Sequence, residues 1–390
     1  MLDSNLSPPE IAAWLREMDA ERLQTLWDAA DRIRRERVGD AVWLRGLVEI
    51  SNRCSRNCLY CGVRAERRVE RYRMTQEEIL ECAKFAKKHG LATLVLQAGE
   101  DRTLDAGFVA ETVRAIRDDF GLIVTLSLGE RTDSELVRWQ EAGARRYLAR
   151  FETSNPTLYR ALHPDVGGTG LTERIDFLKR LREIGYEVGS GVMIGIPGQT
   201  FDDLARDLAL FRELDLDMIG SGPFLPHPGT PLGSLEIRDG YWQTAPIPSA
   251  LSPPQSESAA APRFAFRYPT SSDQVPNTND VAFKVVALSR VLCPDANIPS
   301  VTSVATLDGS GGRKSALSRG ANVIMPNITP TKYRRLYEIY PNKAATFEDA
   351  ETTLQTALRQ IDEIGRFPGV GPGSSKRFLA RVADVSKRER

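Results

Sequence analysis

The stretch GLVEISNRCSRNCLYCGV, residues 46–63, joins a short apolar run to a loop that carries three cysteines within eight positions. An apolar run of this length is typical of a buried strand, so Cys54, Cys58 and Cys61 would lie on the loop that leaves the strand. No cysteine or histidine near this loop offers the fourth ligand that a structural zinc site requires. A 4Fe-4S cluster can be held by three thiolates, with one iron left open to a small molecule. The spacing therefore indicates such a cluster; three buried thiols, or a CxxC redox pair with a bystander cysteine, are the alternatives.

The rest of the chain repeats the pattern of a short apolar run followed by a helical segment. After GLVEI the runs are TLVLQ (93–97), IVTLSL (123–128), RYLARF (146–151), EVGSGVMIGI (187–196), DMIGSGPF (217–224), NIPSVTS (297–303) and ANVIMP (321–326). Eight strands that alternate with helices predict an α/β fold, namely a parallel (β/α)8 barrel of the TIM type. An open doubly wound sheet is the alternative, because the sequence does not show strand order. In a barrel, the cysteine loop would lie at the carboxyl ends of the strands, where barrel enzymes hold their active sites.

We expect three parts of the chain and one interruption. Residues 1–45 carry apolar positions at helical spacing and predict a helical N-terminal extension. Residues 46–343 would form the barrel, and residues 344–390 a helical C-terminal segment with a basic tail. Residues 234–280 break the rhythm, because they are rich in Pro, Ser, Ala and Gln and show no sustained period. A long segment of this composition predicts a disordered insertion.

Composition limits the classes of function. The 52 lysines and arginines balance the 52 aspartates and glutamates, which argues against binding to nucleic acid or to an anionic membrane through bulk charge. No apolar run is long enough to span a membrane, and the start of the chain lacks the pattern of a signal peptide. Three of the five cysteines are bunched and two are isolated, unlike the framework of a secreted disulfide-rich protein. The sequence therefore predicts a cytoplasmic protein without a nucleic-acid or membrane partner.

The fourth apolar run places charge where a barrel interior would be apolar. In RRYLARFE, residues 145–152, the side chains of Arg146, Arg150 and Glu152 share one face, because side chains alternate along a strand. Barrel interiors are normally filled by branched apolar residues, and an unpaired buried charge is costly. Inward arginines therefore predict an anionic substrate, unless an Arg–Glu ion pair only braces the strand.

Other candidates have a structural explanation beside the functional one. Glu100 ends a strand, where a carboxylate can hold a cation or an ammonium group, but the helix dipole also favours a glutamate in the first turn of the next helix. Glycines at 191–198 allow a ligand to approach the backbone closely, or simply permit tight packing. Tyr333, Tyr337 and Tyr340 at helical spacing are more often a packing stripe than a site.

These motifs together resemble a known family. The motif CxxxCLYC at 54–61, behind the first strand of a β/α repeat, is similar to the signature of the radical S-adenosylmethionine (SAM) superfamily. Within it, residues 45–343 resemble HydE, a family of FeFe-hydrogenase maturases, through RYRMTQEEI, LQAGED, TLSLGE, RYLARFETSNP, GIPGQT, GPFLPHPGTPL, GANVIMPNITP and YRRLYEIYP. Methylornithine synthase and biotin synthase are relatives that share some of these motifs.

The resemblance implies one 4Fe-4S cluster and SAM as cofactors. It implies that the cluster is held by Cys54, Cys58 and Cys61, and that SAM contacts Tyr60, Glu100, Ser127, Glu152, Arg174 and Met193. It places catalytic or substrate contacts at Arg146, Arg150, Thr302, Met325, Tyr337 and Tyr340. Thr302 follows a valine where the family has a pair of threonines, which weakens the transfer of that contact. No second group of cysteines follows the tyrosines, so only one cluster should form.

The implied function is to generate a 5′-deoxyadenosyl radical for assembly of the di-iron subcluster of the FeFe-hydrogenase H-cluster. Implied partners are an anionic small-molecule or iron carbonyl cyanide substrate, other hydrogenase maturases, and an electron donor such as ferredoxin or flavodoxin. Two other functions stay open at this point. One is a radical SAM amino-acid mutase like methylornithine synthase, whose substrate carboxylate would suit the same arginines. The other is a non-catalytic iron–sulfur carrier.

Overall fold

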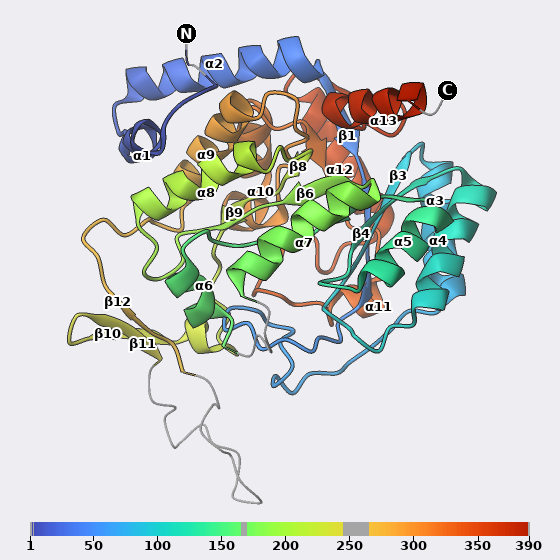
Figure 1. The fold of residues 1–390 in the computed structure, drawn as a ribbon, viewed down its shortest axis with the longest axis horizontal. Coiled ribbons are helices and arrows are strands. Elements are labelled where there is room, and N and C mark those ends of the chain that lie inside the picture. The colour runs from blue at the N-terminus through green and yellow to red at the C-terminus, as the bar shows by residue number, and fades with distance from the viewer. Residues whose placement is uncertain (1, 3, 165–169, 245–264, 389–390) are drawn as a thin grey trace, which may run out of the picture.

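The computed structural model describes residue 2 and residues 4–164, 170–244 and 265–388. Its centre is a set of parallel strands enclosed by helices (Figure 1). Six strands pair side by side in chain order, namely β2 (Gly46–Ser51), β3 (Thr93–Ala98), β4 (Ile123–Ser127), β5 (Ala144–Leu148), β6 (Glu187–Ser190) and β8 (Met218–Ile219). The short strands β7 (Met193–Ile194) and β9 (Gly222–Pro223) pair in parallel beyond β6 and β8. This sequential order of parallel strands confirms the α/β fold and excludes the strand order of a doubly wound sheet.

Single parallel bridges continue this sheet into a ring. The bridged pairs are Met218 with Asn297, Pro299 with Val323, and Leu47 with Asn327. The strand β1 (Ala41–Leu44), which precedes β2, pairs in parallel with β13 (Val323–Ile324). The expected seventh strand at 297–303 is therefore reduced to isolated bridges. One reason is that Asn322 Oδ1 accepts the hydrogen bond from the backbone N–H of Ile298, which a backbone carbonyl of the neighbouring strand would accept in a regular sheet.

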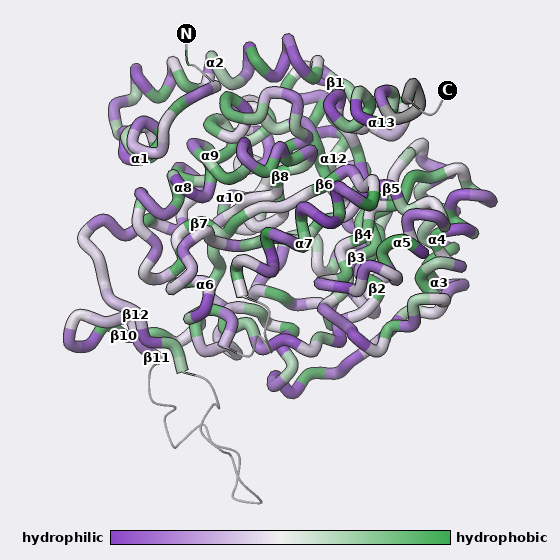
Figure 2. The backbone as a smooth tube through the Cα atoms, viewed as in Figure 1, coloured by the Kyte–Doolittle hydropathy of each residue, from purple (hydrophilic) through white to green (hydrophobic). Residues whose placement is uncertain are grey.

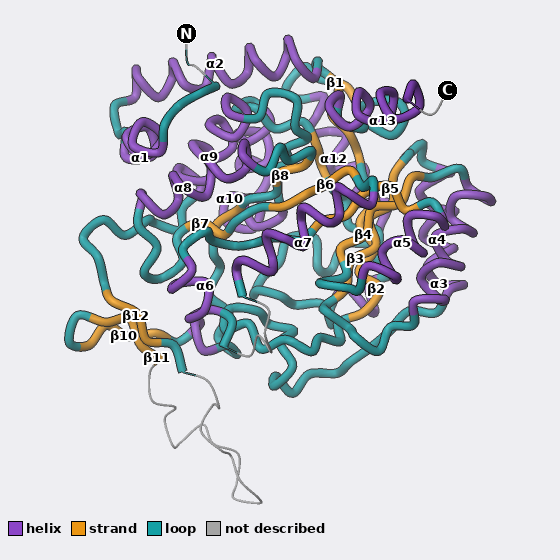
Figure 3. The backbone as a smooth tube through the Cα atoms, viewed as in Figure 1, coloured by secondary structure: helices purple, strands orange, loops and turns teal. Residues whose placement is uncertain are grey.

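Helices follow the strands and cover the outside of the ring (Figure 3). They are α3 (Gln76–Lys88), α4 (Ala106–Phe120), α5 (Asp133–Ala142), α6 (Pro156–Leu162), α7 (Leu171–Ile184), α8 (Phe201–Glu213), α9 (Asn279–Leu292) and α10 (Thr302–Leu317). Thr75, Thr132 and Thr200 start three of them with capping boxes, which satisfy free backbone N–H groups. Apolar residues gather on the helix faces that meet the strands (Figure 2). None of the described helices is long and apolar enough to cross a membrane.

Both ends of the chain pack against the barrel. The helices α1 (Pro8–Arg16) and α2 (Ala20–Val38) contact α8 and α9, but the last residues of the expected 1–45 extension form β1 instead. At the other end are α11 (Thr331–Arg334), α12 (Ala350–Asp362), β14 (Phe367–Pro368) and α13 (Lys376–Arg388). Because β14 pairs with β1, the C-terminal segment is tied to the amino-terminal end of the ring.

Residues 372–375, the floor loop, lie across that end of the ring. Arg146 Nη2 donates hydrogen bonds to Pro372 O at 2.8 Å and to Ser374 Oγ at 2.9 Å. Asn297 Nδ2 donates to Gly373 O at 2.9 Å. These bonds come from side chains inside the ring, so the floor loop closes the barrel interior from below.

The prediction of disorder at 234–280 is wrong for the part of this segment that the structure describes. A 3-10 turn (Pro231–Gly233) leads into an antiparallel sheet of β10 (Leu235–Arg238), β11 (Tyr241–Thr244) and β12 (Arg267–Pro269), which projects at the lower left of Figure 1. Phe266 is buried in an apolar cluster with Leu59 and Met193. Aromatic residues therefore anchor the ends of a Pro/Ser-rich segment, whose residues 245–264 lie outside the described residues.

Candidate active site

A cavity of about 350 Å³ lies inside the ring and reaches the loops at the carboxyl ends of the strands. Eleven of the fifteen residues expected at the site line it, namely Cys54, Cys58, Tyr60, Glu100, Ser127, Arg150, Glu152, Arg174, Thr302, Met325 and Tyr340. The other four expected residues, Cys61, Met193, Tyr337 and Arg146, do not line it. The structure thus brings most of the expected residues together, although they come from widely separated parts of the sequence.

The three cysteines lie on the loop after β2, which its neighbours hold in place. Leu59, between the cysteines, is buried; its N–H donates to Leu162 O, and its carbonyl accepts from Leu232 N–H, both at 3.0 Å. Burial raises the pKa of all three thiols, that of Cys61 to about 12. Iron of a bound cluster would supply the positive charge that stabilises them as thiolates.

The arrangement of the cysteines fits a cluster better than a single ion. Among the described residues, no group of three or more His, Cys, Asp or Glu side chains has the arrangement of a site for one metal ion. A cubane takes each thiolate on a different iron, so the thiols need not converge on one point. The other two cysteines, Cys82 and Cys293, are buried in the apolar core, as expected for inert thiols.

Tyr60 and His163 form a pair beside the cysteines. His163 Nδ1 lies 2.8 Å from Tyr159 O, which can only accept, so this nitrogen carries the proton. His163 Nε2 then accepts from the Tyr60 hydroxyl at 3.1 Å. Burial lowers the pKa of His163 to about 3, which keeps the ring neutral. Sequence reasoning missed His163, because residues 60 and 163 are brought together only by the fold.

Alternating charges line the side of the cavity next to the cysteines. Arg56 Nε donates to Glu100 Oε1 at 2.8 Å, and Arg56 Nη2 donates to Glu130 Oε2 at 2.9 Å. Arg174 Nε lies 2.7 Å from the other oxygen of Glu130. Glu100 and Arg174 are thus held in place by Arg56 and Glu130.

Glu152 is held in an uncommon backbone conformation at the cavity wall. Its φ is 65°, in the left-handed region, which costs an L-residue roughly 1–2 kcal/mol. Its carboxylate lies 2.9 Å from Arg150 Nη2, which also donates to Val192 O at 2.7 Å. Burial raises the pKa of Glu152. Arg150 and Glu152 therefore face the cavity as a pair.

Arg146 does not reach this cavity, which corrects the expectation that it lies beside Arg150 at the substrate. Its side chain is fully buried, and its Nε lies 2.6 Å from the fully buried carboxylate of Glu187 on β6. The alternation along β5 does turn Arg146 inward, but at the level of the floor loop. Here the ion-pair alternative is the one that the structure supports.

The tyrosines do not form the expected stripe on one helix. The helix α11 ends at Arg334, so Tyr337 and Tyr340 follow it in irregular backbone. Gln97 Nε2 donates to the Tyr337 hydroxyl at 3.2 Å, whereas Tyr340 lines the cavity. Burial raises the pKa of both hydroxyl groups, which stay protonated.

A buried ion pair at the cavity was not predicted from the sequence. Lys343 Nζ lies 2.7 Å from Glu49 Oε1 and donates to Tyr337 O at 2.8 Å. Both side chains line the cavity, and Glu49 Oε2 has no hydrogen-bond partner in the described structure. Glu49 stands in GLVEI, and a single charged residue in an apolar run is the signal that could have found it.

We expect Gly99→Ala to lower cluster content. A Cβ at Gly99 would lie 2.8 Å from Cys54 Cβ and would also clash with Arg53 O, so the cysteine loop must shift. Iron per chain after anaerobic reconstitution is the measurement. Gly220→Ala is the control, because a Cβ there meets only Pro299 Cγ at 3.8 Å. Full iron content in the Gly99 variant would contradict the tight packing of this loop.

Comparisons with known proteins agree with this site. A family model for the radical SAM superfamily matches residues 48–211. The [FeFe] hydrogenase maturase subunit HydE of Thermotoga maritima is 42% identical over 360 residues, which cover 92% of this chain and 91% of that protein. A 3-methylornithine synthase of Methanosarcina acetivorans is 24% identical over 93% of this chain and 90% of its own. The crystal structure of methylornithine synthase PylB has a TM-score of 0.74 at 24% identity, covering 93% of this chain and 94% of its own, and supports the fold alone.

Sequence identity of 42% over almost the whole length, together with the cysteine loop at the cavity, decides between the families considered. The protein is an enzyme that uses a 4Fe-4S cluster and SAM, which sets aside the reading as a non-catalytic carrier. The chain therefore belongs to the radical SAM superfamily and, within it, to the family of the [FeFe] hydrogenase maturase subunit HydE.

Proposed function

We propose that the enzyme takes part in assembly of the di-iron subcluster of the H-cluster of an [FeFe] hydrogenase. The observation that carries this proposal is that Cys54 and Cys58 line the same cavity as Arg150, in a chain 42% identical to HydE. When bound and reduced, the cluster would pass one electron to SAM, so that the C5′–S bond breaks to give methionine and a 5′-deoxyadenosyl radical. The protein contributes a cavity that excludes water and orients the reacting groups.

We assign the expected residues to three roles, which are to hold the cluster, SAM and the substrate. Cys54, Cys58 and Cys61 hold the cluster, and SAM is held by Tyr60, Glu100, Ser127, Glu152, Arg174 and Met193. Arg150 holds an anionic substrate, such as an iron carbonyl cyanide fragment, with further contacts from Thr302, Met325, Tyr337 and Tyr340. Ion pairs at Glu100 and Arg174 support this division, because they fix both side chains before the cofactor binds.

The partners of the enzyme follow from the same proposal. A substrate that is an organometallic fragment must be made and then passed on, so other hydrogenase maturases act before and after this enzyme. The cluster must be reduced by one electron, for which a ferredoxin or flavodoxin is suited.

A second candidate is an amino-acid mutase like methylornithine synthase. The cavity contains Arg150, which suits a carboxylate, and the free oxygen of Glu49, which suits an ammonium group. Incubation with lysine, SAM and dithionite separates the two functions. Formation of methylornithine would favour the mutase, whereas activation of apo-hydrogenase would favour the maturase.

Substitutions of Arg150 and Glu152 should affect different activities. Arg150→Ala should keep dithionite-driven cleavage of SAM within a few-fold and lose hydrogenase maturation, because a charge-assisted contact of about 1.5–3 kcal/mol to the substrate is removed. Glu152→Ala should depress both activities, because SAM binds more weakly. Arg150→Lys, which keeps the charge, is the matched control and should restore part of maturation. Normal maturation by Arg150→Ala would refute the anion site.

A further inference from the structure

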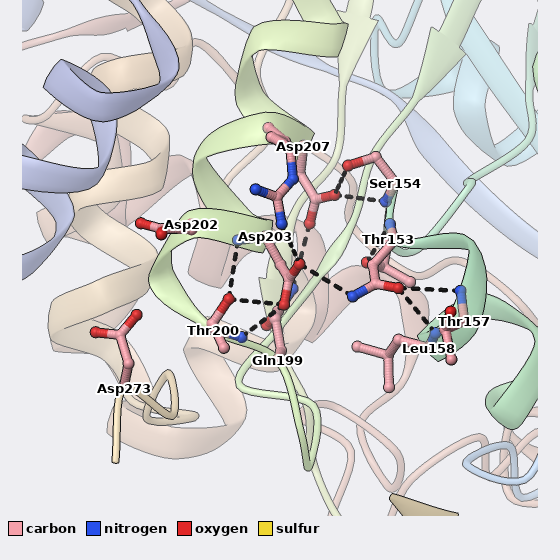
Figure 4. A network of polar contacts seen from close by, with 12 residues as sticks. Thr153, Ser154, Thr157, Leu158, Gln199, Thr200, Asp202, Asp203, Asp207 and Asp273 are labelled. Atoms are coloured by element: carbon pink, nitrogen blue, oxygen red, sulfur yellow. Dashed lines mark hydrogen bonds and ion pairs between the residues drawn. The ribbon is translucent and has the colours of Figure 1, made fainter. Parts of the chain in front are cut away.

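Asp207 is a buried carboxylate outside the cavity to which no role has been given above. It lies on α8, its side chain is fully buried, and no Lys, Arg or His pairs with it among the described residues. Figure 4 shows it between the turn after Glu152 and the loop before α8. Its hydrogen-bond partners come from both segments.

The first contact fixes the turn that follows Glu152. Ser154 donates to Asp207 Oδ1 twice, from its backbone N at 2.5 Å and from its hydroxyl at 2.6 Å. Ser154 stands two residues beyond Glu152, whose φ of 65° is unfavourable for an L-residue. Asp207 therefore holds the segment that must stay in place for the Glu152 carboxylate to face the cavity.

The second contact reaches Met193 through Gln199. Gln199 Nε2 lies 3.3 Å from Asp207 Oδ2 and donates to Met193 O at 3.1 Å. Gln199 Oε1 accepts from Gly195 N at 2.7 Å. The amide thus fixes the backbone beyond β7, and the carboxylate of Asp207 fixes the amide.

We propose that Asp207 is a positioning residue of the SAM site, because one carboxylate ties the turn behind Glu152, through the Gln199 amide, to the backbone of β7 at Met193. At the cavity side, the same two segments are joined by a backbone bond from Met193 N to Glu152 O at 3.1 Å. Asp207 makes the matching connection behind the strands. The inference rests on the proposed roles of Glu152 and Met193 as cofactor contacts.

The ionisation of Asp207 gives this role a signature in pH. Burial raises the pKa of Asp207 to about 7, and Asp203 on the same helix adds to the increase. All contacts of Asp207 are N–H or O–H donors, so they favour the ionised carboxylate over the protonated form, whose own O–H would have no acceptor among them. SAM affinity should therefore rise as pH increases through about 7.

The free energy of unfolding should change with pH in the opposite sense. A carboxyl whose pKa is raised in the folded state contributes most stability below its unfolded pKa, and that contribution is lost as pH rises through the folded value. Asp207 thus favours folding at low pH and cofactor binding at high pH. A residue with a purely structural role would change only the stability.

The test compares Asp207→Asn with Asp202→Asn in the reconstituted holoenzyme. An asparagine keeps one oxygen as acceptor for Ser154, but its NH2 group would face the NH2 group of Gln199, and two donors cannot bond to each other. SAM should therefore bind about 10–100-fold more weakly, with unchanged iron content. The pH dependence of affinity around 7 should disappear as well. Asp202 is a suitable control, because it lies on the same helix, is 60% exposed and pairs with Arg16. The dissociation constant comes from titrating the electron paramagnetic resonance signal of the reduced cluster with SAM.

Two further variants keep the outcome decisive. Ser154→Ala removes one bond to Asp207 and should weaken SAM binding in the same direction; it replaces Asp207→Asn if that variant does not fold. Wild-type affinity and an unchanged pH profile in the tested variant would overturn the role of Asp207. If Glu152→Ala also leaves SAM affinity unchanged, the cofactor-contact assignment fails first; if Glu152→Ala weakens SAM binding, only the inference about Asp207 fails.

Discussion

Cys58→Ala should abolish both the cluster and the cleavage of SAM, and so should replacement of Cys54 or Cys61. Three thiolates hold the cluster, and no further cysteine lies on the same loop to replace a lost one. The wild-type chain should hold about four irons after anaerobic reconstitution, whereas each variant should lose the cluster absorption in the visible spectrum. The yield of 5′-deoxyadenosine under dithionite is the second measurement.

Cys82→Ala and Cys293→Ala provide the controls for this experiment. Both thiols are buried in the apolar core, and burial raises the pKa of each to about 12. Their replacement should leave iron content and SAM cleavage close to those of the wild type. About eight irons in a homogeneous wild-type preparation, or full activity of Cys58→Ala, would contradict a single cluster.

Arg146→Ala should destabilise the fold by about 3–5 kcal/mol, because it leaves the carboxylate of Glu187 buried without its partner. Both side chains are 0% exposed, so water cannot replace the lost guanidinium. The bonds from Arg146 to the floor loop would be lost as well. Urea denaturation, followed by far-ultraviolet circular dichroism, measures the change.

The double variant Arg146→Met with Glu187→Leu separates charge burial from packing. Replacing both members of a buried ion pair by apolar residues is often neutral or stabilising. The double variant should therefore recover much of the stability that is lost in Arg146→Ala. Arg145→Ala, one residue earlier and only partly buried, should change the free energy of unfolding by less than about 0.5 kcal/mol. Loss of hydrogenase maturation with unchanged stability in Arg146→Ala would instead indicate that Arg146 contacts the substrate.

The order of elements could be predicted from the sequence because each one buries an apolar run. β3, β4 and the helices after them follow directly from short apolar segments and from helix caps such as Thr75 and Thr132. The reduction of the predicted seventh strand to isolated bridges could not be foreseen, because the side chain of Asn322 replaces part of its ladder. The sheet at 235–269 was missed because few residues in that segment carry an apolar signal.

The site could be predicted in part, for a similar reason. A motif such as CxxxCLYC, or a carboxylate at a strand end such as Glu100, is local and can be read from the sequence. Alternation along β5 gives the face of Arg146, but it does not give the depth of this side chain in the barrel, which depends on pairing with Glu187 of β6. Pairs such as Lys343 with Glu49 depend on the closure of the whole ring.

The floor loop determines when the barrel can be completed during biosynthesis. Glu187 is synthesised well before Ser375, whose backbone N–H donates a hydrogen bond to its carboxylate. Arg45 is likewise synthesised long before Gly373, to whose carbonyl oxygen it donates. At about 5–20 residues per second, the delay between these residues is on the order of 10 s or more. Until then the nascent chain holds charged groups at the bottom of an unsealed barrel. The closed cavity that would receive the iron–sulfur cluster is therefore complete only after the floor loop has been synthesised and has bound Glu187 and Arg45.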